Sequence, residues 1–204
     1  PLLTPVGKSG RRANGSDVFG IDSVNEFDVF LDDIYDYCEM LDIGVDTLVH
    51  ESGPSQIEIN LNHGDPLKLA DQTFMFKRAV RQVALKHGIH ATFMAKPHQG
   101  QPGSSMHIHQ NLVSTKDHKN IFTDLDGKET KAFYQYIGGL QEYLPDAMVF
   151  FAPYVNSYRR FVMHSSAPIN THWGFENRTV GLRVPLSSPH SKRVENRIPG
   201  ADTN

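Results

Sequence analysis

The hydrophobic residues in the first half of the chain recur at steps of three and four, the spacing of an amphipathic helix, in two stretches. The first stretch, residues 27–41, follows Asn25, which we expect to cap the helix. The second begins after Asp65, another capping residue, and ends before Gly88, which suits the exit from a helix. The pattern therefore predicts two amphipathic helices in this half.

A third stretch with the same spacing, residues 130–144, lies in the second half of the chain. Pro145 follows it, and because proline lacks the N–H donor that a helix interior needs, we expect the helix to end there. The segment Asp46–Asn62 has a different pattern. It predicts two short strands joined or bent at Gly53–Pro54.

The stretch ATFMAKPHQGQPGSSMHIHQNL, residues 91–112, joins a Gly/Pro-rich loop to a strand. Residues 93–94 predict the end of a buried strand before the loop. In the strand after the loop, alternate side chains point to opposite faces, so His107 and His109 share one face while Ile108 points to the other. We expect the loop and the histidine strand to form one unit beside a cleft.

The rest of the chain consists of expected loops and short strands. Residues 114–128 indicate a hairpin or surface loop, and strands are expected around residues 158–162, 179–185 and 193–197. The order of helices and strands predicts an α+β fold, in which an antiparallel or mixed sheet is backed by helices on one face.

Composition and charge narrow the classes of partner. The chain has 204 residues, with 20 Lys and Arg against 23 Asp and Glu, and its net charge of −3 gives no basic field for nucleic acid or a membrane surface. No apolar run is long enough to span a membrane, no secretory leader is apparent, and the single Cys38 fits a reducing compartment, so we expect a cytoplasmic protein. The start at Pro1 and the end at GADTN indicate a piece of a longer chain.

Glu51 and Glu58 lie in a stretch rich in Leu, Val and Ile, where a buried carboxylate needs a compensating cation. Their odd spacing would put them on opposite faces of a strand, but a bulge at Gly53–Pro54 could bring them to one face. Taken alone, the pair favours salt bridges to arginine over a metal site.

His107 and His109 taken alone are better explained as hydrogen-bonded structural groups than as ligands. Glu195 lies between Arg193 and Arg197 at a spacing of two, so these three side chains share one strand face. Such a group is either a ladder of salt bridges or a metal ligand surrounded by anion-binding residues. Hard oxygen ligands with a single imidazole suit Mg²⁺ or Mn²⁺ rather than a structural zinc ion.

The last quarter of the chain carries a set of arginines in strand or loop contexts. The guanidinium group binds carboxylates and phosphates through two parallel hydrogen bonds. Together with divalent cations among carboxylates, such a set is typical of phosphoryl transfer, although no Walker A motif or dinucleotide fingerprint is present. The set comprises Arg160, Arg178, Arg183, Arg193 and Arg197.

These motifs together resemble the catalytic domain of the glutamine synthetase family, over residues 26–204. The resemblance rests on five segments in the family's order: HESGPSQIEIN, TFMAKPHQGQPGSSMHIHQNL, NSYRRF, SAPINTHWGFENRTVGLRVP and RVENRIPGADTN. It implies a glutamine synthetase-type fold, truncated at both ends. Residues 1–204 would be a partial catalytic domain without the small N-terminal domain and the C-terminal end.

The resemblance also implies a ligand set. Glu51 and Glu58 would hold one Mg²⁺ or Mn²⁺ ion, and His107 with Glu195 would hold a second that bridges to the γ-phosphate of ATP. A glutamate–x–glutamate strand that the family carries before this region is missing here. We therefore expect the chain alone to be weak or inactive.

The same resemblance assigns the remaining site residues. Arg160, assisted by Gly103, would bind the carboxylate of L-glutamate, and Arg178 and Arg197 would act with Glu195 on the transferred phosphoryl group. The residues that would border the nucleotide are His109, Arg183 and Arg193.

Two departures concern the amine that reacts with glutamate. Ser166 stands where glutamine synthetases carry a flap glutamate that binds ammonium, and Pro102 stands where they commonly have asparagine. The sequence is therefore more similar to the glutamate–putrescine ligase branch, which makes γ-glutamyl amides of a small amine or polyamine through γ-glutamyl phosphate. The alternatives are an ammonia-dependent glutamine synthetase and a non-catalytic relative that binds glutamate or nucleotide. A ring-shaped homo-oligomer is implied for the parent protein.

Overall fold

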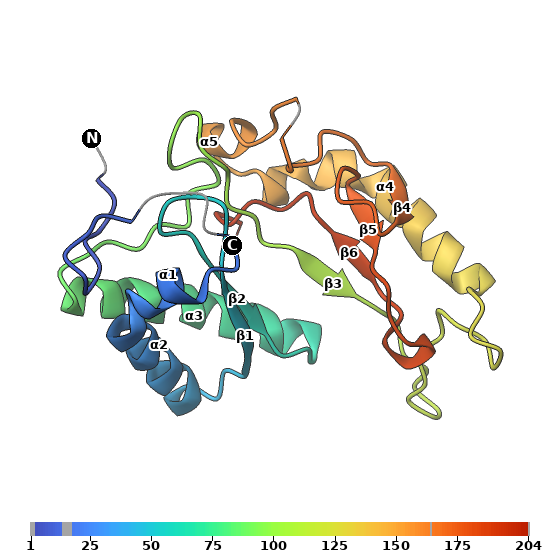
Figure 1. Cartoon of the computed structure of the whole chain (residues 1–204). Coiled ribbons are helices and arrows are strands. Elements are labelled where there is room, and N and C mark those ends of the chain that lie inside the picture. The colour runs from blue at the N-terminus through green and yellow to red at the C-terminus, as the bar shows by residue number, and fades with distance from the viewer. Residues whose placement is uncertain (1–2, 14–17, 164, 204) are drawn as a thin grey trace. The chain divides into compact units, whose positions relative to one another are not determined.

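The structure, a computed structural model, describes residues 3–13, 18–163 and 165–203. The chain divides into two compact units, a first unit of residues 1–93 and a second unit of residues 94–204 (Figure 1). Each unit has its own hydrophobic core and its own sheet. We describe each unit by itself.

The first unit combines helices with a two-stranded antiparallel sheet. The expected helices at 27–41 and 65–88 are confirmed, but Asn25 is the last residue of a short preceding helix and does not cap the next one, whose N-cap is Phe27. The elements are α1 (Ile21–Asn25), α2 (Asp28–Met40), β1 (Val45–His50), β2 (Ile57–Leu61) and α3 (Pro66–Lys86).

Helix α3 begins and ends at the residues that the sequence indicates. The Asp65 side chain accepts hydrogen bonds of 3.0 Å from the backbone N–H groups of Leu67 and Lys68. Pro66 occupies the first turn, where its missing N–H has no cost. Gly88 takes a φ of +69° just after the helix, a conformation that glycine adopts without strain.

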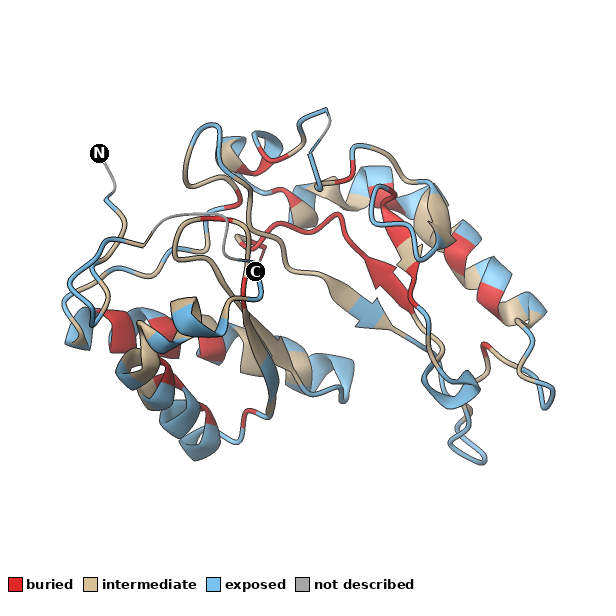
Figure 2. Cartoon of the chain, viewed as in Figure 1, coloured by how far each residue is buried: buried red, intermediate tan, exposed pale blue. Residues whose placement is uncertain are grey.

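The hairpin of β1 and β2 has one apolar face and one polar face. Leu48, Ile57 and Ile59 pack against a core built from α2 and α3, with Leu31 and Val83 among its buried members. Figure 2 shows buried stretches along both helices. Because successive side chains of a strand alternate, the residues between these positions point to the other face. The hydrophobic effect thus fixes which side of the hairpin carries its polar groups.

The second unit is built on a mixed four-stranded sheet in the order β3-β6-β5-β4. The pairs β3–β6 and β5–β6 are antiparallel and β4–β5 is parallel, which confirms the expected mixed sheet. Its elements are β3 (Ile108–Gln110), α4 (Lys131–Phe151), α5 (Val155–Tyr158), β4 (Trp173–Phe175), β5 (Leu182–Val184), the 3-10 helix η1 (Pro189–Ser191) and β6 (Val194–Asn196).

Helix α4 covers one face of this sheet (Figure 1). Phe133 and Ile137 of the helix are buried together with Leu182, Val184 and Val194 of the strands. The segment expected as a hairpin or surface loop, residues 114–128, precedes this helix and is tied by isolated bridges rather than by full strands. The core therefore lies between α4 and one side of the sheet, and the other side is left for polar groups.

The expected end of the third helix at Pro145 is wrong. Helix α4 continues to Phe151 with Pro145 inside it. Proline leaves the carbonyl of Gln141 without its intrahelical donor, but Met148 and Phe151 beyond it pack against the core. Burial of apolar surface by the last turns outweighs one lost hydrogen bond.

Two expected strands are also absent from the described residues. Residues 93–94 form no strand, although Phe93 packs against the first unit's core. Of the expected strand at 158–162, Tyr158 ends helix α5 and the rest forms a turn and loop, while β4 at Trp173–Phe175 was not predicted. Short strands carry too few residues for their alternation to be recognised without their partners. None of the helices in the described part of the chain has the length and apolar character needed to cross a bilayer.

The packing of α4 generates a test of the second unit's core. Ile137 is 1% exposed, and its replacement by Ala should lower the free energy of unfolding by about 2–5 kcal/mol because a cavity is left. Leu125→Ala is the matched control, since Leu125 is 97% exposed and should change stability by less than about 0.5 kcal/mol. Urea unfolding followed by circular dichroism measures both; equal effects would contradict the described core.

Candidate functional site

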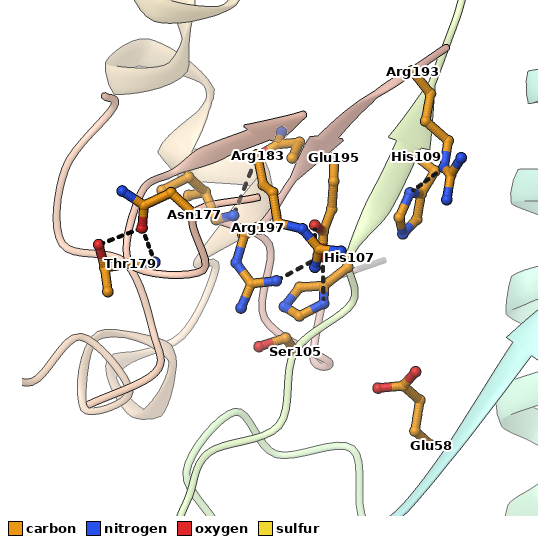
Figure 3. Close-up of polar contacts among 12 residues, drawn as sticks. Glu58, Ser105, His107, His109, Asn177, Thr179, Arg183, Arg193, Glu195 and Arg197 are labelled. Carbon is orange, nitrogen blue, oxygen red and sulfur yellow. Dashed lines mark hydrogen bonds and ion pairs between the residues drawn. The ribbon is translucent and has the colours of Figure 1, made fainter. Parts of the chain in front are cut away.

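The polar face of the second unit's sheet brings together most of the expected site residues (Figure 3). In the strand register, His109 lies opposite Glu195, and Glu195 lies opposite Arg183. Cross-strand partners point to the same face, so these three side chains form a row across β3, β6 and β5. His107 lies just before β3 and Arg197 just after β6, and both belong to this face because each contacts the Glu195 carboxylate.

Glu195 is the centre of this face and is 2% exposed. Its Oε1 lies 2.7 Å from Nη1 of Arg197 and 3.2 Å from Nδ1 of His107, and its Oε2 lies 3.0 Å from Nη1 of Arg183. A carboxylate removed from water needs such compensation, because an unpaired buried charge costs several kcal/mol. Arg193 instead donates from Nε to Nδ1 of His109 over 3.0 Å.

His107 is held in its neutral form. Burial, as the largest cause, and the nearby positive charges of Arg197 and Arg160 together lower the pKa of its imidazole to about 3. A neutral imidazole has a lone pair available, which is the form that binds metal ions. The face therefore offers a neutral nitrogen ligand beside a carboxylate, within a group of guanidinium cations.

Arg160 and Gly103, both of which the family resemblance assigns to the binding of glutamate, are in close contact. A Cβ atom added to Gly103 would lie 2.6 Å from Cγ of Arg160 and 2.7 Å from the carbonyl oxygen of Ala95. Arg160 is 1% exposed and donates to Oγ of Ser105 over 2.7 Å and to the carbonyl of Ile198. Burial lowers the pKa of its guanidinium to about 10, although the charge of Asp202 acts in the opposite direction.

Arg178 lies apart from this cluster in the described contacts. It is exposed in the turn between β4 and β5, next to Asn177. The Asn177 Oδ1 accepts hydrogen bonds from the backbone N–H and the hydroxyl of Thr179, at 2.9 and 2.7 Å, which stabilises the turn. A side chain in this position is free of the buried ion pairs that hold the other arginines.

Glu51 and Glu58 belong to the first unit. Glu58 lies opposite Val49 on the polar face of the hairpin, whereas Glu51 follows the last residue of β1 and its backbone N–H donates to the carbonyl of Gln56 over 2.8 Å. The expected bulge at Gly53–Pro54 is wrong: the irregularity lies between Val45 and Thr47, at the other end of the strand. Oε1 of Glu58 accepts a hydrogen bond of 3.0 Å from Asn60.

The described residues contain no group of three or more His, Cys, Asp or Glu side chains that could hold a metal ion. His107 and Glu195 supply two suitable donors in the second unit, and Glu51 and Glu58 two more in the first. Each pair fits a divalent cation in donor type but is incomplete within its own unit.

The arginines fit an anionic ligand. Within the described part of the chain, Nε of each of three buried or half-buried arginines has no hydrogen-bond partner, although Nη1 of each contacts an oxygen acceptor. Such donors favour phosphate or carboxylate oxygens, which accept guanidinium hydrogen bonds. The three are Arg160, Arg183 and Arg197.

Some residues of the site were missed by the sequence reasoning. Asn156, Ser157 and Asp202 hold Arg160's segment in place, and the segments NSYRRF and RVENRIPGADTN contained all three. Asparagine, serine and aspartate are common turn residues, so their type gave no signal. Their role depends on which distant segments they contact.

The geometry of the site and the comparisons with known proteins indicate the same class of protein. The family model of the glutamine synthetase catalytic domain matches residues 2–204, so the chain belongs to this family of ligases. The expected resemblance and the expected fold class are confirmed.

Three relatives are similar to most of this chain. The γ-glutamylputrescine synthetase PuuA of Escherichia coli (strain K12) is 40% identical over 95% of this chain and 41% of the relative. The glutamate–isopropylamine ligase of a Pseudomonas species is 35% identical over 99% of this chain and 43% of the relative. The glutamine synthetase of Pyrococcus horikoshii is 39% identical over 84% of this chain and 38% of the relative.

The fold also matches that of a solved structure. The complex of GmaS with ADP matches with a TM-score of 0.81 and 29% identity, covering 94% of this chain and 45% of that structure's chain. The chain thus spans about two-fifths of the length of the relatives that it matches.

The contact between Gly103 and Arg160 can be tested with one methyl group. Gly103→Ala should lower the free energy of unfolding by about 1–3 kcal/mol, because the added methyl meets a backbone carbonyl that cannot move aside easily. Gly138→Ala makes the same change at an open position inside α4 and should raise stability by about 0.5–1 kcal/mol. Thermal unfolding of both variants measures the difference, and the same sign for both would refute the packing of Gly103.

Proposed function

We propose that the complete protein is an ATP-dependent ligase that joins glutamate to a small amine, and that putrescine or another polyamine is its substrate. The observation that carries the proposal is the buried Glu195 between Arg183 and Arg197, beside the neutral His107, in a member of the glutamine synthetase family. Oriented guanidinium groups around a carboxylate are suited to an oxygen-rich anion whose charge increases during reaction.

The proposed reaction has two steps. The side-chain carboxylate of glutamate attacks the γ-phosphorus of ATP, ADP leaves, and γ-glutamyl phosphate forms. The amine nitrogen then attacks the acyl carbon, phosphate leaves, and the nitrogen loses a proton to give the γ-glutamyl amide. Arg197 and Arg178 would neutralise charge on the transferred phosphoryl group, and Arg160 with Gly103 would hold the glutamate.

We further propose that the complete protein binds Mg²⁺ or Mn²⁺, with His107 and Glu195 of the second unit as ligands of one ion and Glu51 and Glu58 of the first unit as ligands of another. When bound, such an ion would screen the negative charge of the phosphates. Glu195 then has two functions, because it also offsets the charges of the arginines beside it. The residues proposed to border the nucleotide are His109, Arg183 and Arg193.

The choice of amine is proposed from Ser166 and Pro102. Ser166 is exposed and brings no negative charge to the position where the family's ammonia ligases carry glutamate. A serine leaves more room for an alkyl amine and gives no carboxylate to hold ammonium. The relatives PuuA and the isopropylamine ligase support an amine substrate, whereas the Pyrococcus relative favours the second candidate, glutamine synthetase.

The experiment that tests this function is phosphate release by the complete protein with ATP, glutamate and Mg²⁺ or Mn²⁺. We expect release with putrescine to exceed release with ammonium at least tenfold, with isopropylamine and ethanolamine as further amines. Release with ammonium alone would identify a glutamine synthetase.

A variant of Glu195 tests whether this face performs the chemistry. Glu195→Ala should abolish amine-dependent release, because the metal ligand and the partner of two buried arginines are both lost. Circular dichroism of the variant distinguishes loss of chemistry from loss of fold. A folded variant with unchanged activity would remove Glu195 from the site.

Ser166 should decide between the two amines. Ser166→Glu is expected to raise kcat/KM for ammonium relative to putrescine, because a carboxylate attracts the small cation and occupies space. Ser166→Gln is the matched control, since it adds the same bulk without charge. Comparison of the two ratios separates charge from size, and no change in either variant would show that this position does not select the amine.

A further inference from the structure

Helix α5 and the turn after it contact two segments that are distant in sequence, the Gly/Pro-rich loop and the last described residues. Asn156 binds Lys96, Ser157 binds Asp202, and Arg160 binds Ser105. The turn continues past the helix, since Arg160 N–H donates to the carbonyl of Ser157. The segment has few residues, yet it connects the Gly/Pro-rich loop to the end of the described chain.

Asn156 makes two hydrogen bonds to the backbone of one residue, Lys96. Its Oδ1 accepts from the backbone N–H of Lys96, and its Nδ2 donates to the backbone carbonyl of the same residue, both at 2.9 Å. A side-chain amide is the uncharged group that offers a donor and an acceptor side by side. The pair of hydrogen bonds therefore fixes the orientation of the peptide groups on either side of Lys96.

Lys96 is one end of the loop that contains Gly103, and Ser105 is the other. The ends meet through the N–H of Ser104, which donates to the carbonyl of Ala95 over 2.9 Å. Asn156 holds the first end and Arg160 holds the second, over 2.7 Å to Ser105. Asn156 belongs to α5 and Arg160 to the turn after it, so one short segment holds both ends of the loop.

We propose that Asn156 is a positioning residue: it fixes the Lys96–Ser105 loop so that Gly103 stays against Arg160. The proposal rests on the proposed function, in which this loop and Arg160 bind glutamate. Arg160 would have to exchange its Ser105 contact for a substrate carboxylate. Asn156 then keeps the loop closed while the guanidinium changes partner.

The experiment uses the complete protein with two variants. Asn156→Ala removes both hydrogen bonds, and Asn156→Asp keeps the size and the acceptor but replaces the donor by an oxygen that repels the Lys96 carbonyl. The matched control is Asn120→Ala, because Asn120 also binds backbone groups, at Lys192 over 2.7 Å and at Phe122 over 2.9 Å, in another part of the second unit. Hydrogen exchange of residues 96–105 and the KM values for glutamate and ATP are measured.

Both Asn156 variants should increase exchange in residues 96–105 and raise the KM for glutamate about tenfold, with the KM for ATP changed less than about twofold. Asn120→Ala should leave the exchange of this loop and the glutamate KM unchanged. An unchanged loop in both Asn156 variants, or faster exchange with an unchanged glutamate KM, would overturn the proposal. If the unaltered protein shows no ligase activity, the proposed function fails, and loop exchange alone decides whether Asn156 holds the loop.

Discussion

A carboxylate buried on a sheet is the constraint on which the polar face of the second unit depends. The opposite side of β5 and β6 is hydrophobic core, so the charge of Glu195 has to be offset from its own side. Arg183 supplies one partner from the neighbouring strand, and Arg197 supplies another from the same segment. The strand register that pairs Arg183 with Glu195 also places His109 opposite the carboxylate. The charge of Glu195 and the register of β3, β5 and β6 thus determine which side chains lie on this face.

The guanidinium of Arg160 sets a second constraint, because a buried cation needs several acceptors. It finds them in Ser105 and the carbonyl of Ile198, and its stem fills the space that Gly103 leaves open. The Gly/Pro-rich loop, the α5 turn and the last described residues are therefore mutually dependent. A loop with many glycines is mobile in isolation, and here its two ends are tied to one helical turn.

The first unit also separates an apolar face from a polar face, but on a hairpin of two strands. Its hairpin buries Leu48, Ile57 and Ile59 against two helices and leaves Glu58 on the other face. Removal of the apolar face from water is favourable, and a shift of one residue would expose it, so the register is strongly specified. In a member of the glutamine synthetase family, that register fixes the side on which the candidate metal ligand Glu58 lies.

The sequence by itself determined the amphipathic helices, the caps Asp65 and Gly88, the strand faces of β3 and β6, and the family, because these depend on local periodicity and on residues close in sequence. Only the tertiary structure decided the rest. Helix α4 runs through Pro145 because its last turns reach the core, and the hairpin register places Glu58 opposite Val49 on the polar face. Ion-pair partners of Glu195 and the contacts of Asn156 join distant segments, so no local pattern could specify them.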